Sequence, residues 1–148
     1  MADDEKMSPA GEQSATFGSA SSTDRGVVLT PGLARLGGGE LNQAITSALV
    51  GIHSRYLGRG PQSATTFYHG NVVVSLMNGV LTHAERRLSE TNQGEAVNHM
   101  RHLFQEAMEA DFTEAIERLT ARKVVAFISG NNLDPDVAAE VFILDEPL

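Results

Sequence analysis

The sequence predicts an α+β domain, a four-stranded antiparallel sheet with helices on one face, in the order α-β-β-α-α-β-β. Two observations support this fold class. Three stretches carry helix signals, and four short β-rich runs fall into two pairs that are each joined by a turn. With 148 residues, of which 41% are hydrophobic, the chain has the size of one ordinary domain.

The amino-terminal segment differs in composition from the rest of the chain. Residues 1–24 are mainly Ser, Ala, Gly and Thr with scattered charges, and they offer too little apolar surface to offset the entropy cost of ordering. Residues 26–36, GVVLTPGLARL, are more apolar and precede three glycines, which predicts a docking segment on a flexible hinge. We therefore expect residues 1–38 to form a disordered tail and residues 39–148 to form one domain.

The first helix is predicted at residues 40–56 from an apolar stripe at helical spacing. The stripe consists of Leu41, Ile45, Ala48, Leu49, Ile52 and Tyr56. Gly58 suits the left-handed position that follows a helix, and Pro61 prevents the helix from continuing. The chain should therefore turn a corner at residues 58–61.

A β-hairpin and two helices are predicted next. Residues 64–68 and 72–76 are β-rich runs separated by three residues with turn chemistry, His-Gly-Asn. Thr82 and Glu85 have the spacing of a capping box, which opens a short helix to about residue 90. From Gly94 an apolar face indicates a longer helix, with an expected break or bend near Asp111.

The last two strands complete the predicted sheet. The run KVVAFIS at 123–129 is apolar on both faces, which is typical of an interior strand. A turn rich in Asn and Asp follows and contains Pro135, and the last strand should lie at about residues 140–144.

Composition disfavours several classes of function. The formal net charge of −8 and the pI of about 5.0 oppose binding to a nucleic-acid backbone. There is no cysteine for disulfides, zinc-thiolate sites or thiol catalysis. No run approaches the ~20 apolar residues that span a bilayer, and the acidic start lacks the core of a signal peptide. We expect a cytoplasmic protein that does not insert into the membrane and needs no cofactor.

The loop at residues 58–61 has two interpretations. Its glycines around an arginine resemble loops that hold phosphate, but a Walker-type loop follows a strand and precedes a helix, and here the order is reversed. The loop is either only a helix stop or an anion contact through Arg59 and exposed backbone amides. The candidate anion- or ligand-binding residues are Arg59, Gly60, Thr82, Arg101 and Ser129. Structural roles are predicted for Gly58, Pro61, Glu85 and Pro135.

Metal binding and catalysis have weaker support. His99 and His102 are three residues apart with glutamates one turn away, a spacing that is more typical of a solvated polar helix face than of a metal site. Asp134 and Asp136 flank Pro135 without the spacing of a calcium loop, which favours a turn-forming role. Ser129 precedes a glycine but lacks a nucleophile elbow, so we expect no metal site and no catalytic set.

Four segments together resemble the MpsC family, a bacterial domain named for a sodium-translocating, membrane-potential-generating system. They are RYLGRGP, GVLTHAERRL, VNHMRHLFQEAM and AIERLTARKVVAFISGNNLDPDVAAEVFIL, and the resemblance covers about residues 40–146. The family pattern usually has Thr-Gly-Arg where this chain has Thr-Ala-Arg at 120–122, which puts a glycine-dependent conformation there in doubt. The resemblance implies a cytosolic partner or regulator of ion or inorganic-carbon transport, and it supplies no catalytic residues.

Two functional hypotheses follow. The first is a non-catalytic interaction or regulatory protein that has a membrane-transport protein as its partner. The alternative is a small-molecule or anion-binding protein, or a weak enzyme, that uses the loop at 58–61. In either case we expect a homodimer or higher homo-oligomer, because a small four-stranded sheet leaves two edges and one face uncovered.

Overall fold

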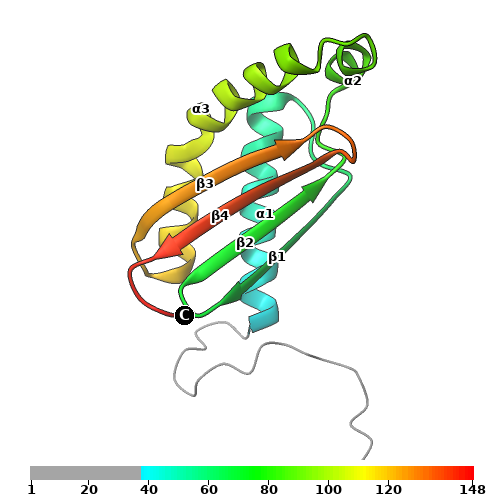
Figure 1. The fold of residues 1–148 in the computed structure, drawn as a ribbon. Coiled ribbons are helices and arrows are strands. Elements are labelled where there is room, and N and C mark those ends of the chain that lie inside the picture. Colours follow the sequence, from blue (N-terminus) through cyan, green and yellow to red (C-terminus); the bar gives the residue numbers. More distant parts are fainter. Residues whose placement is uncertain (1–37) are drawn as a thin grey trace, which may run out of the picture.

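The computed structural model describes residues 38–148, so the predicted tail and docking segment lie outside the described residues. The fold is α+β, and the predicted order α-β-β-α-α-β-β is confirmed (Figure 1). The elements are α1 (Gly38–Leu57), β1 (Ser63–His69), β2 (Val72–Asn78), α2 (His83–Glu90), α3 (Gly94–Thr120), β3 (Val124–Asn132) and β4 (Val137–Leu144).

The four strands form one antiparallel sheet in the order β1-β2-β4-β3. The hairpins β1-β2 and β3-β4 lie side by side because β2 pairs with β4. Figure 1 shows α1 and α3 against the same face of the sheet, and no described element covers the opposite face. Between residues 38 and 148, no helix is both long enough and apolar enough to cross a membrane.

One detail of the sequence prediction is wrong. The apolar run at 123–129 was expected to be an interior strand, but β3 is an edge strand that pairs only with β4. Its outward side chains are exposed, Val125 by 63% and Ile128 by 61%, because they belong to the uncovered face of the sheet. The bend expected in α3 is present: the helix is continuous, without a break, and Figure 1 shows its axis change direction where its colour turns to yellow. The Asp111 carboxylate accepts a hydrogen bond from the Tyr56 hydroxyl at 3.1 Å, which ties α3 to α1.

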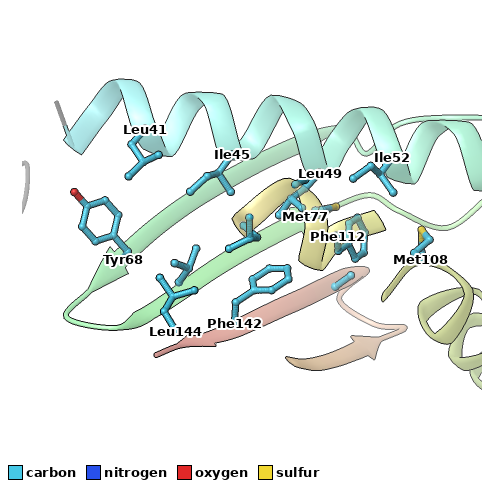
Figure 2. Packing of buried hydrophobic residues seen from close by; sticks show 14 of the residues in the cluster. Leu41, Ile45, Leu49, Ile52, Tyr68, Met77, Met108, Phe112, Phe142 and Leu144 are labelled. Atoms are coloured by element: carbon cyan, nitrogen blue, oxygen red, sulfur yellow. The ribbon is translucent and has the colours of Figure 1, made fainter. Parts of the chain in front are cut away.

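The core lies between the sheet and the two long helices. The apolar stripe of α1 points at the strands as predicted, and Phe112 of α3 and Phe142 of β4 fill the centre (Figure 2). Each fully buried large side chain of this kind stabilises the fold by about 1.5–3 kcal/mol relative to exposure. The buried members include Leu41, Ile45, Leu49, Ile52, Tyr68, Val73, Met77, Met108, Phe112, Ile116, Phe142 and Leu144.

The two long helices both end at a residue in the left-handed conformation. Gly58 has φ of +76°, and its N–H donates to the Ser54 carbonyl at 2.9 Å. Ala121 ends α3 in the same way, with φ of +55° and a hydrogen bond to the Glu117 carbonyl at 2.9 Å. The chain therefore adopts the left-handed conformation at position 121 without a glycine.

Candidate functional site

Polar side chains are buried between the helices and the sheet, next to the apolar core. We call this group the buried polar cluster, and its most enclosed members are between 1% and 7% exposed. Because burial of polar groups is costly unless they are paired, such a cluster marks a place where the sequence departs from an ordinary apolar core. The cluster consists of His53, Glu85, Arg101, Gln105, Ser129, Asn131 and Glu140.

An ion pair between Glu85 and Arg101 connects α2 to α3. The capping box at the start of α2 fixes the Glu85 carboxylate, because its Oε2 accepts the Thr82 N–H at 2.7 Å and the Thr82 hydroxyl accepts the Glu85 N–H at 3.2 Å. Arg101 Nη1 donates to both Glu85 oxygens at 3.1 Å, and Arg101 Nε donates to Asn131 Oδ1 at 3.2 Å. One arginine therefore joins α2, α3 and β3.

The electrostatics of Glu85 follow from these contacts. Burial alone would raise the pKa of this carboxyl, but the hydrogen bond from the Thr82 N–H and the charge of Arg101 outweigh burial and hold the pKa below its usual value. Glu85 is thus ionised at neutral pH in an interior position. The positive charge of Arg101 helps to keep the Glu85 carboxylate ionised.

The segment at residues 79–82, which leads into α2, is held from two directions. Arg59 Nη1 donates to the Leu81 carbonyl at 2.8 Å, and Nη2 donates to the Gly79 carbonyl at 3.1 Å. The Asp136 carboxylate accepts the Val80 and Leu81 N–H groups at 3.1 Å. The guanidinium and the carboxylate thus satisfy backbone groups that have no partner in a helix or strand.

His53 is enclosed by this region without being bonded to it. The side chain is 2% exposed, and neither ring nitrogen has a hydrogen-bond partner among the described residues. Burial and the nearby Arg101 charge lower the pKa of His53, so the imidazole is neutral at pH 7.

Glu140 lies in a polar row that crosses the inner face of the sheet. Ser75 and Ser129 are its opposite neighbours on β2 and β3, and Thr66 of β1 lies opposite Ser75. Thr66 and Ser75 are hydrogen-bonded through their hydroxyls at 3.2 Å, and Thr66 is bonded to Thr46 of α1 at 2.8 Å. Within residues 38–148, Glu140 Oε2 and the Ser129 hydroxyl have no hydrogen-bond partner.

Burial raises the pKa of Glu140 to about 7, against a smaller opposing effect of Ser129 and Arg101. The Ser129 hydroxyl is near enough to favour the ionised carboxylate, but its geometry falls short of a hydrogen bond. Near neutral pH this carboxyl therefore exchanges between its neutral and its charged form. Glu140 is buried, with 1% of its surface exposed.

The structure brings together most of the residues that the sequence singled out. Arg59, Thr82 and Arg101 meet around the start of α2, and Ser129 lies two residues from Asn131, which bonds to Arg101. Both guanidinium groups bond to oxygens of the protein itself. Gly60 lies beside α1, where an added Cβ would come within 2.9 Å of the Ser54 hydroxyl. The geometry of this group supports a role in connecting elements of the fold.

The remaining sequence candidates have local roles. Pro61 follows the corner at Gly58, and Pro135 lies in the turn between β3 and β4, where its carbonyl accepts the Asn132 side-chain amide at 2.7 Å. His102 pairs with Glu106 on the exposed surface of α3 at 3.4 Å. In the part of the chain that the structure describes, no group of three or more His, Asp or Glu side chains is arranged to hold a metal ion.

Sequence reasoning missed His53, Gln105 and Glu140 as members of the cluster. Glu140 left a signal, because it alternates with Ala138 and Phe142 in β4 and therefore had to share their buried face. His53 and Gln105 left none, since a polar residue on a helix is ordinarily solvated. Their burial depends on the way α1 and α3 pack together over the sheet.

Comparison with models of protein families assigns a family to this chain. A family model described as "Na+-translocating membrane potential-generating system (MpsC)" matches residues 38–146. An uncharacterised protein of Bacillus subtilis (strain 168), YrhF, is 25% identical over 99 residues, which are 66% of this chain and 81% of YrhF. No solved structure matches significantly. Because the family model spans almost the whole described structure, the chain belongs to the MpsC family.

Proposed function

We propose that the protein is a small non-catalytic interaction or regulatory protein, which acts from the cytosol as a homodimer on a membrane ion or inorganic-carbon transport system. The uncovered face of the sheet carries this proposal. The family description, a sodium-translocating and membrane-potential-generating system, supports the link to a membrane partner. The enclosure of His53, Glu85 and Arg101, each no more than 3% exposed, supports a non-catalytic role, because no reactant could reach them.

The uncovered face is apolar and carries no strong charge. Glu140 is the only Asp, Glu, Lys or Arg in the four strands, and it points to the helices. The opposite set of strand residues makes up the outer face. It includes Phe67, Val72, Val74, Leu76, Ala126, Ile128, Val137, Ala139, Val141 and Ile143.

The size of this face suits self-association. Four strands of about seven residues cover roughly 450 Å² in projection, which is comparable with the largest apolar patch on a typical monomer, about 300–600 Å². Two such faces, with their side-chain relief, approach the ~1,200 Å² at the lower end of specific interfaces. An uncharged contact surface also suits two identical chains that each carry a net charge of −8.

Light scattering after size-exclusion chromatography tests the dimer. At tens of micromolar we expect twice the chain mass of 15.8 kDa. Ile128→Glu should give a monomer, because it buries a carboxylate in an apolar contact. Leu103→Glu is the matched control, since Leu103 is 51% exposed on α3, away from the sheet, and this variant should stay dimeric. A monomeric wild-type chain at these concentrations would reject the dimer.

Sedimentation with membranes tests the transport link. Vesicles from cells that express the transport system should carry the purified protein into the pellet, whereas protein-free liposomes of the same lipids should not. Protease treatment of the vesicle surface should abolish the binding, because the proposed partner is a protein. Equal binding to protein-free lipid, or no binding to either, would overturn the proposal.

A further inference from the structure

A groove runs along the free edge of the sheet, between β3 and α3. β3 pairs with β4 on one side only, so the backbone N–H and C=O groups on its other side have no strand partner. α3 borders this edge closely. The Phe112 and Phe127 rings lie 6.1 Å apart, and Glu117 Oε1 accepts the Val124 N–H at 3.0 Å.

The groove contains a hollow of about 190 Å³ with an unsatisfied floor. Its lining residues are His102, Gln105, Glu106, Glu109, Phe127 and Ser129. Gln105 is only 7% exposed, and its amide Nε2 has no hydrogen-bond partner among the described residues. The Ser129 hydroxyl is likewise buried and unpaired in residues 38–148. Two enclosed polar groups at the base of an open hollow indicate a site that a polar ligand completes.

Carboxylates line the helical side of the groove. Glu106 and Glu109 border the hollow and also a second depression of about 570 Å³, which continues along α3 past Glu114 and Glu117. Glu109 and Glu114 form no ion pair with any residue in the described range. The helix carries six acidic residues against two arginines, one of which is the buried Arg101. A ligand of this surface should therefore be positively charged.

The edge itself lacks the usual protection against an added strand. Natural edge strands are blunted by lysine, proline or an inward-pointing charge, and the sequence of β3, VVAFISGNN, contains none of these. Its bulge lies at one end, between Val124 and Ala126, and leaves the rest of the strand in regular register. Residues 126–132 therefore present an unbroken template for strand addition.

We propose that this groove binds an extended, lysine- and arginine-rich peptide segment of a protein partner, which adds to β3 as a fifth strand beside α3. Alternate side chains of such a strand point to opposite faces. One set would lie over Glu106 and Glu109, where basic residues are favoured, and the other would lie beside the exposed Ile128, where apolar residues are favoured. The expected ligand thus alternates basic and apolar residues.

This inference rests on the proposed function, because it names the part of a membrane partner that the protein would contact. Cytoplasmic loops of membrane proteins carry an excess of lysine and arginine. A soluble partner with an acidic groove matches that chemistry. The site uses the edge of the sheet, whereas the proposed dimer uses its outer face, so the two contacts are compatible.

Fluorescence anisotropy with synthetic peptides tests the proposal. The probe is a labelled nine-residue peptide with blocked termini that alternates lysine and valine. We expect saturable binding to the wild-type protein. A peptide with glutamate in place of lysine should bind at least tenfold more weakly, and so should a peptide that is N-methylated at alternate backbone amides, which keeps its charges but cannot pair with a strand. Equal affinity for either control peptide would overturn the proposal.

Matched protein variants locate the site. Glu106→Gln combined with Glu109→Gln should weaken binding of the lysine peptide at least tenfold. Glu90→Gln combined with Glu95→Gln removes the same charge away from the groove, and this variant should bind within about twofold of wild type at 0.15 M salt. Equal losses in the two double variants would show nonspecific charge attraction and refute the groove. Vesicle sedimentation of the wild type separates the proposals: membrane binding without peptide binding would reject only the groove, and peptide binding without membrane binding would reject only the transport link.

Discussion

Removing the Arg101 side chain is the most direct test of the buried polar cluster. Arg101 and Glu85 have 4% and 2% of their side-chain surfaces exposed, so Arg101→Ala leaves an enclosed carboxylate with no counter-charge. Breaking a buried pair by removing one partner costs about 3–5 kcal/mol. Since a domain is stable by only about 5–15 kcal/mol, this single change should remove a large part of its stability.

Urea denaturation followed by circular dichroism measures this cost at pH 7, with linear extrapolation to water. Arg87→Ala is the matched control, because Arg87 pairs with Glu90 at a similar 3.3 Å but with 72% and 54% of the two side chains exposed. An exposed pair of this kind contributes about 0–1 kcal/mol. Millimolar phosphate should not change the comparison if Arg101 serves Glu85 and not an external anion.

The pH dependence gives a second check on the same variant. The pKa of Glu85 is lowered in the folded state, so its stabilising effect is present above its unfolded pKa and is lost as pH falls through the lowered folded value. In Arg101→Ala the Arg101 charge no longer opposes the effect of burial, so Glu85 takes up a proton at a higher pH than in wild type, and the cost of the variant should shrink as pH falls from 7 to 4. A cost below about 1 kcal/mol at pH 7, equal to that of an exposed pair, would refute the reasoning.

Four further predictions use the same denaturation assay. Glu140→Gln should gain about 2.5 kcal/mol of stability relative to wild type between pH 5 and pH 8. The reason is that a native pKa of about 7 makes wild-type stability fall as pH rises above the ordinary value of 4.5, and a pH-independent difference would contradict this. Gly58→Ala should cost about 1 kcal/mol of stability, because Gly58 has a φ of +76° that alanine resists. An unchanged stability would contradict the structural role of Gly58 at the end of α1. Arg59→Ala should cost about 1–3 kcal/mol of stability because it leaves two backbone carbonyls unpaired. A loss below about 0.5 kcal/mol, which is expected for an ordinary surface change, would contradict this prediction. Ala121→Gly should stabilise by about 0.5–1 kcal/mol, and a loss would show that the left-handed cap at φ of +55° is wrong.

Local signals in the sequence predicted the elements of the fold well. The stripe on α1, the capping box at Thr82 and the left-handed Gly58 each depend on residues within about one helical turn of one another, so their physics is visible in a short window. The order of elements followed from the same signals. What a short window could not give was the order of the strands in the sheet, which depends on contacts between hairpins.

The edge position of β3 illustrates this limit. A strand that is apolar on both sides is typical of a central strand in a covered sheet, and the prediction took this pattern as the sign of an interior position. The described structure has no such cover, so the same apolar residues lie on an open face, and β4 with its glutamate is central instead. Apolar residues on an open face are consistent with the proposed dimer, in which a second copy of the chain would cover them.

The sequence predicted several residues of the candidate site but not the groups that they contact. The sequence pointed to Arg59, Thr82 and Arg101 as ligands for an anion, since arginine beside glycine and threonine is the composition of many such sites. In the structure these groups meet, but backbone carbonyls and Glu85 hold their charges. An internal acceptor that lies far away in the sequence has the same chemistry as an external one, and only the fold distinguishes them. Binding is therefore more reasonably sought where polar atoms remain unpaired, at Gln105 and Ser129 beside the open edge of β3, than at the arginines that first suggested it.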